Sequence, residues 1–222
     1  MSARTRIKFC GMTRAGDIAA AVALGVDAIG LIFAERSPRR VDLASARALR
    51  AAVPPFVSVV ALLMDTPPTE VERVVQVLRP QLLQFHGAEE EADCARFGVP
   101  YLRAVPMGDA ASGDAHATAR ALEFVARYPS ASGFILDGHA HGAAGGSGTR
   151  FDWSQIPASM PRPWLLAGGL DADNVAAAIA AARPFGVDVS SGIERAPGEK
   201  DPARMQRFVA EVRRVDGTTT QR

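Results

Sequence analysis

Short apolar runs alternate with stretches of helical periodicity along nearly the whole chain. Eight of these runs are rich in Val, Ile, Leu and Phe, which is typical of parallel strands buried on both faces. They are Ile7–Cys10, Ala28–Phe33, Val57–Leu63, Leu82–Phe85, Tyr101–Val105, Gly133–Leu136, Trp164–Ala167 and Val187–Val189. Between them, apolar residues recur at i, i+3, i+4 and i+7, and this spacing predicts amphipathic helices.

Eight strand–helix units in 222 residues predict an α/β protein with one domain, a single (β/α)8 TIM barrel over residues 1–222. An open, doubly wound parallel sheet fits the same periodicity and stays open as the alternative. No linker interrupts the pattern. We expect a flexible loop over residues 139–148, after the sixth strand, and a flexible tail over residues 216–222.

Composition and charge exclude several classes of function. The net charge of +1 gives no basic surface for nucleic acid or an anionic membrane. No apolar run approaches the roughly 18 residues that span a bilayer, and the first residues lack the apolar core of a signal peptide. The two cysteines, Cys10 and Cys94, make no disulfide framework. We therefore expect a cytoplasmic protein that binds neither nucleic acid nor membranes.

Polar residues gather where the predicted strands end, and this end carries the active site in (β/α)8 barrels. Gly168 and Gly169 precede a predicted helix, and Ser190, Ser191 and Gly192 follow the eighth strand. Backbone amides in such loops bind phosphate, and the helix dipole adds to the attraction. Either loop alone is explained as well by a tight turn. Both together, after strands seven and eight, favour a phosphate site.

The first strand carries a candidate base. Alternation puts Lys8 and Cys10 on one face, so that Cys10 lies at the mouth of the barrel and Lys8 one layer below. A thiol near a fixed positive charge loses its proton more easily and can act as a base. The alternative is a small buried hydrophobic residue. Cys94 fits that alternative, because it lies in a helical stretch away from the strand ends.

Three other strand-end residues have side chains suited to catalysis or binding. Asp137 ends the sixth strand and is either a general acid, kept protonated by partial burial, or a turn residue before Gly138. His86 follows the fourth strand and is interpreted as an orienting donor, with an acid/base role left open. Arg39 has a planar fork suited to a carboxylate, or is one surface arginine among many. The sequence contains no motif with metal-ligand spacing, so we predict no metal site.

Taken in order, these motifs resemble the phosphoribosylanthranilate isomerase family from residue 7 to about residue 212. An isolated Cys-Gly-Met-Thr would mean little, whereas the ordered set is highly specific. The matching segments are 8–13, 27–33, 37–39, 83–87, 136–137, 145–148, 151–153, 166–170, 174–175, 187–194 and 197–201. The segment Asp137-Gly138-His139-Ala140 departs from the family's familiar continuation after the acid.

The resemblance implies an isomerase of tryptophan biosynthesis. Its reaction would convert N-(5-phosphoribosyl)anthranilate to 1-(2-carboxyphenylamino)-1-deoxyribulose 5-phosphate by an acid/base Amadori rearrangement. Cys10 would be the general base, Asp137 the general acid and Arg39 the ligand of the anthranilate carboxylate, with His86 lining the site. The phosphate would be bound by Gly168, Gly169, Ser190, Ser191 and Gly192. No metal or organic cofactor is implied, and the chain would be a monomer or a homodimer.

Three other functions remain open as alternatives. A related isomerase of the histidine pathway usually has a carboxylate at the end of strand one, where this chain has Cys10. A Schiff-base aldolase needs a lysine at the mouth, but Lys8 is expected to lie too deep and Lys200 follows the last strand. A non-catalytic phosphate-binding barrel would leave Cys10, Arg39 and Asp137 without a shared purpose.

Overall fold

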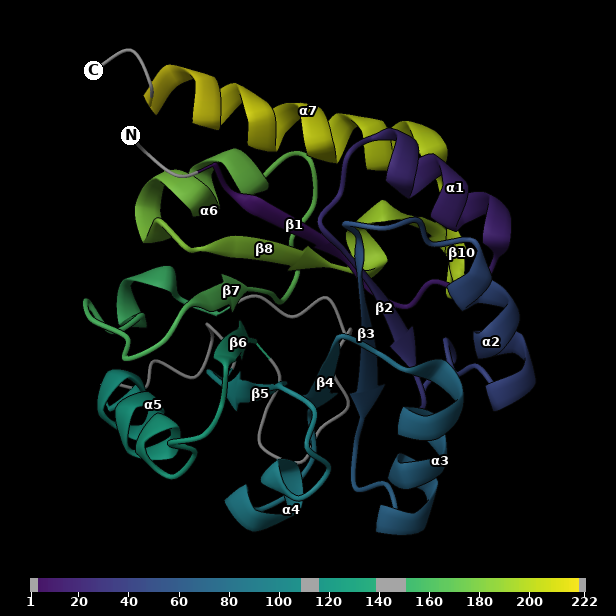
Figure 1. Ribbon diagram of the computed structural model, residues 1–222. Helices are drawn as coiled ribbons and strands as arrows, with labels where there is room; N and C mark the ends of the chain where they lie inside the picture. Colours follow the sequence, from purple (N-terminus) through teal and green to yellow (C-terminus); the bar gives the residue numbers. More distant parts are fainter. Residues whose placement is uncertain (1–3, 109–115, 139–150, 220–222) are drawn as a thin grey trace.

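Eight parallel strands close into a barrel in a computed structural model that describes residues 4–108, 116–138 and 151–219. Each strand is hydrogen-bonded to the next, and β8 returns to β1 (Figure 1). The strands are β1 (Arg6–Phe9), β2 (Ala28–Ile32), β3 (Ser58–Leu63), β4 (Leu82–Phe85), β5 (Tyr101–Pro106), β6 (Gly133–Asp137), β7 (Trp164–Leu166) and β8 (Gly186–Val189). The predicted barrel is confirmed, and closure excludes the open sheet.

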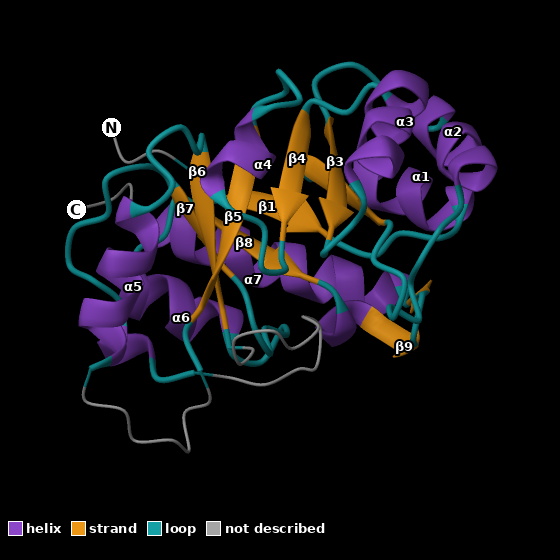
Figure 2. Cartoon of the chain, turned by 90° about the horizontal axis from the view of Figure 1, so that it is seen from below, coloured by secondary structure: helices purple, strands orange, loops and turns teal. Residues whose placement is uncertain are grey.

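Helices cover the outside of the barrel (Figures 1 and 2). They are α1 (Ala15–Ala23), α2 (Leu43–Ala51), α3 (Pro68–Leu78), α4 (Glu91–Ala95), α5 (Ala117–Ala126), α6 (Val175–Ala182) and α7 (Pro202–Thr219). Within the described part of the chain, β6 is followed by a 3₁₀ turn, η2 (Trp153–Gln155), and not by an α-helix. The predicted flexible loop over 139–148 lies outside the described residues.

Successive side chains of β1 point alternately toward the surrounding helices and toward the interior of the barrel. Ile7 and Phe9 belong to the large core between barrel and helices, where the Phe9 ring meets that of Phe208 on α7 edge-on at 6.1 Å. Lys8 and Cys10 point the other way and are both buried. The predicted placement of these two side chains on one face of the strand is therefore confirmed.

The last helix is tied to the start of the first strand. Of the predicted flexible tail over 216–222, residues 216–219 form the end of α7, and residues 220–222 lie outside the described part of the chain. The Asp216 carboxylate accepts hydrogen bonds from the Thr5 amide at 3.1 Å and the Thr5 hydroxyl at 2.7 Å. These bonds tie the last helix to the chain just before β1, and local sequence patterns cannot predict partners so far apart.

One further element lies outside the repeating pattern. A small antiparallel hairpin, β9 (Glu194–Ala196) and β10 (Glu199–Lys200), stands between β8 and α7 and was not predicted.

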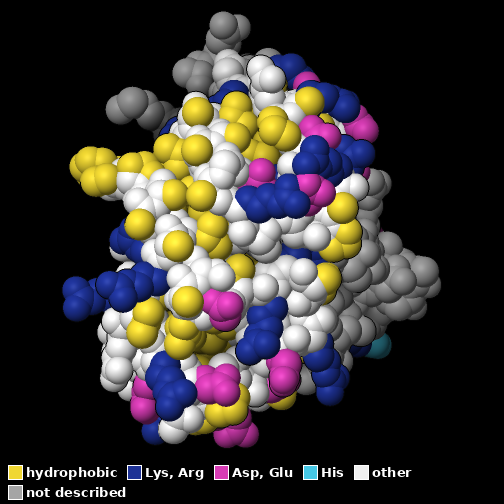
Figure 3. Space-filling view, turned by 90° about the vertical axis from the view of Figure 1, so that its right-hand side faces the viewer, with side chains coloured by type: hydrophobic (Ala, Val, Ile, Leu, Met, Phe, Trp, Pro, Cys, Tyr) yellow, Lys and Arg dark blue, Asp and Glu magenta, His cyan; other side chains and the backbone are white. Residues whose placement is uncertain are grey.

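On the face that carries α1, α2 and α3, acidic and basic side chains are interspersed, and hydrophobic side chains gather toward the left edge of the view (Figure 3). Of the helices in the described ranges, none combines the length and apolar character that a membrane span requires.

Candidate active site

A pocket opens at the carboxyl ends of the barrel strands, where the sequence placed the chemistry. It encloses about 690 Å³, part of it open to solvent. Side chains from both ends of the sequence meet there because β1 and β8 are neighbours in the closed barrel. Eight of the nine predicted site residues line it: Cys10, Arg39, His86, Asp137, Gly168, Gly169, Ser190 and Ser191.

Gly192 is the predicted site residue that does not line the pocket. A Cβ atom at this position would lie 1.9 Å from the carbonyl oxygen of Leu170. Only glycine therefore allows the loop after β8 to pack against the loop after β7. Gly192 brings the two candidate phosphate loops together, while Ser190 and Ser191 line the pocket itself.

The Cys10 thiol lies at the mouth of the barrel in a tight position. A Cβ atom on Gly30 of β2 would be 2.8 Å from Cys10 Sγ, so glycine at that position leaves the space that the thiol fills. Burial raises the pKa of the Cys10 thiol, and the positive charges of Lys8 and Lys200 offset only part of that rise. The expected gain in acidity from Lys8 is thus outweighed by desolvation.

Below Cys10, a buried ion pair joins the first and last strands of the barrel. Lys8 Nζ donates to Asp188 Oδ2 at 2.8 Å, and the two residues are directly paired in the β1–β8 register. Burial disfavours the charged lysine, but the Asp188 carboxylate and Cys10 outweigh that effect and raise the pKa of Lys8. Asp188 also lines the pocket, and its place at the end of the eighth strand had indicated no role for it.

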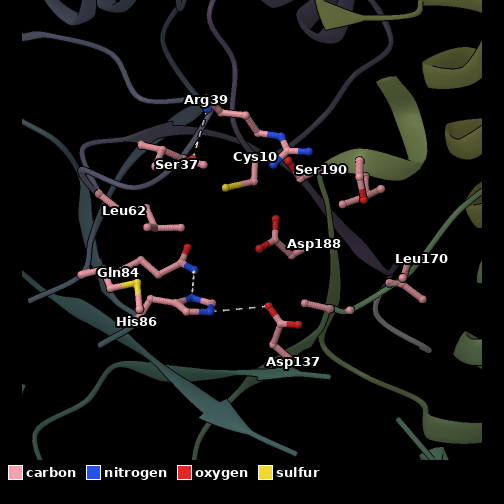
Figure 4. Close-up of a pocket in the computed structure, with 18 residues that line it drawn as sticks. Cys10, Ser37, Arg39, Leu62, Gln84, His86, Asp137, Leu170, Asp188 and Ser190 are labelled. Carbon is pink, nitrogen blue, oxygen red and sulfur yellow. Dashed lines mark hydrogen bonds and ion pairs between the residues drawn. The ribbon is translucent and has the colours of Figure 1, made fainter. Parts of the chain in front are cut away.

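Asp137 and His86 form the wall of the pocket opposite Cys10 (Figure 4). His86 Nε2 lies 3.7 Å from Asp137 Oδ2, and His86 Nδ1 lies 3.4 Å from Gln84 Nε2. Both His86 and Asp137 are buried. Asp188 lies between Cys10 and Asp137 in this view, so ionisable groups face the pocket from opposite sides.

Arg39 is buried and held by a carboxylate that the sequence did not connect with it. Its Nε and Nη2 donate to the two oxygens of Glu194, on β9, at 2.9 and 2.7 Å. The alternative of a surface arginine is therefore wrong, because the residue is only 7% exposed. The Arg39 guanidinium does bind a carboxylate, but that carboxylate belongs to Glu194 of the same chain, and binding of a ligand carboxylate stays a prediction.

Lys200 links three parts of the site. Its Nζ donates to the Cys10 carbonyl at 2.6 Å, the Ser190 carbonyl at 3.1 Å and Glu194 Oε1 at 2.8 Å. Burial lowers the pKa of Lys200, and the Glu194 carboxylate opposes that effect. The sequence did not predict this role, although one signal existed: Lys8 and Lys200 are the chain's only lysines, and both are buried.

The arrangement can bind a phosphorylated ligand and move protons on both sides of it. The loops after β7 and β8 offer backbone and hydroxyl donors, and a thiol and a carboxyl group flank the same space. Among the described residues, no group of three His, Cys, Asp or Glu side chains is placed to hold a metal ion.

Comparisons with known proteins agree with this chemistry. The profile of the N-(5'-phosphoribosyl)anthranilate (PRA) isomerase family matches residues 7–211. The chain is 58% identical over 213 residues to N-(5'-phosphoribosyl)anthranilate isomerase of Xanthomonas euvesicatoria, covering 96% of this chain and 95% of that one.

Two solved structures show the same fold. One is a phosphoribosyl anthranilate isomerase in complex with reduced 1-(o-carboxyphenylamino)-1-deoxyribulose 5-phosphate, with 29% identity, a TM-score of 0.76 and coverage of 94% of this chain and 98% of that chain. The other is a monomeric form of the dimeric enzyme from Thermotoga maritima, with 28% identity, a TM-score of 0.74 and the same two coverages.

Proposed function

Because this chain belongs to the phosphoribosylanthranilate isomerase family, we propose that Cys10 and Asp137 are the base and the acid of its reaction. The enzyme converts N-(5'-phosphoribosyl)anthranilate to 1-(2-carboxyphenylamino)-1-deoxyribulose 5-phosphate in tryptophan biosynthesis. The observation that carries the assignment is that a thiol and a carboxyl group face one pocket from opposite sides, beside the two candidate phosphate loops.

The first step is ring opening. Asp137 donates its proton to the ring oxygen of the ribose as the bond from C1 to that oxygen breaks. The nitrogen of the anthranilate supplies the electron pair, which leaves an iminium between nitrogen and C1. The nearby His86 imidazole, 3.7 Å from the carboxylate, is placed to orient Asp137 and to stabilise its charged form afterwards.

The second step is removal of the proton at C2. The Cys10 thiolate takes this proton, and the electron pair moves through the C1–C2 bond to neutralise the iminium nitrogen. The resulting enolamine gains a proton at C1 and loses one from the C2 hydroxyl to give the ketone. Since the substrate nitrogen receives the electrons, the proposed mechanism uses no metal or organic cofactor.

Binding is divided between the two ends of the substrate. We assign the phosphate to the loops with Gly168, Gly169, Ser190 and Ser191, since these line the pocket and offer backbone amide and hydroxyl donors to an anion. The anthranilate carboxylate is assigned to Arg39, whose Nη1 takes no part in the pair with Glu194.

Addition of the protein to phosphoribosylanthranilate should accelerate the loss of its fluorescence over the uncatalysed rate, and an unchanged rate would contradict the function.

An Arg39→Lys substitution tests the carboxylate assignment. Lysine keeps the charge but loses the planar fork, so both the pair with Glu194 and the bond to the ligand weaken. We expect KM to rise roughly 10-fold, the worth of one charge-assisted hydrogen bond, with a smaller change in kcat. Arg40→Lys is the matched control, because Arg40 is exposed and does not line the pocket. An unchanged KM in the Arg39 variant would remove Arg39 from ligand binding.

We also propose that the enzyme is cytoplasmic and forms a homodimer. Both cysteines are buried free thiols, as is usual in a reducing compartment.

The proposal of a dimer rests on the amino-terminal end of the barrel, opposite the pocket. Phe56, just before β3, is fully exposed at a φ of 68°, and half-exposed Phe185 precedes β8. They border an apolar hollow, and a projection and a hollow on one face suit a symmetric pair.

Light scattering on a sizing column should give the mass of two chains for the wild-type enzyme. Phe56→Glu should give the mass of one chain, because a charge at that place cannot enter an apolar hollow. Its kcat should stay within about two-fold of wild type, since the active site lies at the other end of the barrel. Leu122→Glu on α5, another exposed apolar position, should leave the dimer intact. A monomeric wild-type protein would contradict the proposal.

A further inference from the structure

Arg103, on β5, is a fully buried cation that does not line the pocket. It is 1% exposed and is among the largest completely buried side chains of the described residues. A buried charge costs several kcal/mol unless hydrogen bonds and an opposite charge compensate for it. Its partners therefore show what the fold uses this arginine for.

The guanidinium bonds to the backbone on both sides of His86. Arg103 Nη1 donates to the Phe85 carbonyl at 2.8 Å, and Nη2 donates to the Gly87 carbonyl at 2.6 Å. One planar group with a fixed separation between its nitrogens thus sets the distance between these carbonyls. The His86 amide is held as well, because it donates to the Leu63 carbonyl at 3.0 Å.

A carboxylate fixes the guanidinium from within the same loop. Glu89 Oε2 lies 3.5 Å from Arg103 Nη1. The Glu89 carboxylate also accepts hydrogen bonds from the amides of Gly87 at 2.9 Å and Asp65 at 2.7 Å. The cation, its counter-charge and the loop after β4 are therefore parts of one network, joined to the loop after β3 through Asp65.

Two aromatic rings, Phe124 on α5 and Tyr128 just after that helix, lie against the guanidinium. Arg103 Cζ lies 4.8 Å from the centre of the Tyr128 ring and 5.1 Å from that of Phe124. The Tyr128 hydroxyl donates to the Glu89 carbonyl at 2.8 Å. A lysine could supply the charge at this place, but it could neither stack on the rings nor present two donors in one plane.

We propose that Arg103 is a positioning residue for the acid step, fixing the His86 backbone so that the imidazole is held beside Asp137. The inference rests on the proposed role of Asp137. The imidazole lies between Gln84, at 3.4 Å, and Asp137, at 3.7 Å, so a shift of its backbone changes both separations. A misplacement of about 1 Å near reacting groups can reduce a rate by about 10²-fold.

The test compares Arg103→Lys with Arg127→Lys. Arg127 is an exposed arginine whose Cζ lies 4.7 Å from the Phe124 ring and 5.9 Å from the Tyr128 ring. It shares the rings with Arg103, whereas the donor to the Phe85 and Gly87 carbonyls is Arg103. We expect Arg103→Lys to lower kcat roughly 10- to 100-fold with KM within a few-fold, and Arg127→Lys to change neither. The imidazole resonance of His86, assigned by its loss in His86→Gln, should move only in the Arg103 variant.

A double variant separates this proposal from the proposed function. If Arg103 acts through the acid, Arg103→Lys should cost almost nothing in an Asp137→Asn background, because coupled residues are not additive. An equal fractional loss in that background, a wild-type kcat in folded Arg103→Lys, or an equal loss in Arg127→Lys would each overturn the proposal. Should Arg103→Lys fail to fold, Tyr128→Phe removes one bond of the network and should give a smaller loss of kcat with the same shift of the His86 resonance. If Asp137→Asn were itself fully active, the proposed function would fail independently of Arg103.

Discussion

Asp137→Asn is expected to lower kcat roughly 10²–10⁴-fold, the usual worth of a positioned acid. Asparagine has nearly the same shape, but it cannot give a proton to the ribose ring oxygen. Binding of the substrate phosphate should stay near normal, since the loops after β7 and β8 are unchanged. Steady-state kinetics, with binding of a product analogue, measures both effects.

Dependence on pH gives a second readout for Asp137. In the wild-type enzyme, kcat should fall as pH rises and the acid loses its proton. The residual activity of Asp137→Asn should lack that fall. Asp152→Asn is the matched control: Asp152 is an exposed capping residue that accepts from the Ser154 amide at 2.9 Å, and asparagine can keep that bond. Full activity of the Asp137 variant would mean that the proton comes from elsewhere, with His86 the next residue to test.

Cys10→Ser is expected to lower kcat by a similar factor, roughly 10²–10⁴-fold, with the fold retained. Serine fills nearly the same space beside Gly30, but its hydroxyl is far less acidic than a thiol and cannot serve as the base at C2. Cys94→Ser provides the matched control, because Cys94 is equally buried but lies on α4, away from the pocket. That variant can lose stability, yet its kcat should match the wild type. Activity of Cys10→Ser within a few-fold of wild type would exclude the thiol from the mechanism.

The proposed role of Cys10 as the base also predicts how activity depends on pH. The base must be a thiolate, so activity that depends on Cys10 rises with pH. Burial raises the Cys10 pKa, and in Asp137→Asn, where the acid no longer contributes, the midpoint of that rise should lie above the pKa of a free cysteine. A midpoint well below this value would show that Lys8 and Lys200 outweigh burial in solution.

The fold was predictable because its signals are local and repeated. Each strand is a short apolar run and most helices show a clear stripe, so the eight strands could be counted without knowledge of any contact. The pattern failed where local signals were weak or absent. The hairpin β9–β10 has only five residues in its strands, and the end of α7 depends on the bond between Asp216 and Thr5.

By itself, the sequence determined the barrel, the end of it that carries the chemistry and the candidate residues. Cys10, His86 and Asp137 stand at the ends of recognisable strands, and Arg39 stands in the loop that follows the second strand. Only the tertiary structure decided how these residues are held. Barrel closure pairs Lys8 with Asp188, the hairpin brings Glu194 to Arg39, and Arg103 holds the loop of His86. These partners are separated by between 16 and 180 residues along the chain. Contacts of that kind leave no periodic signal, because they depend on the path of the backbone through space.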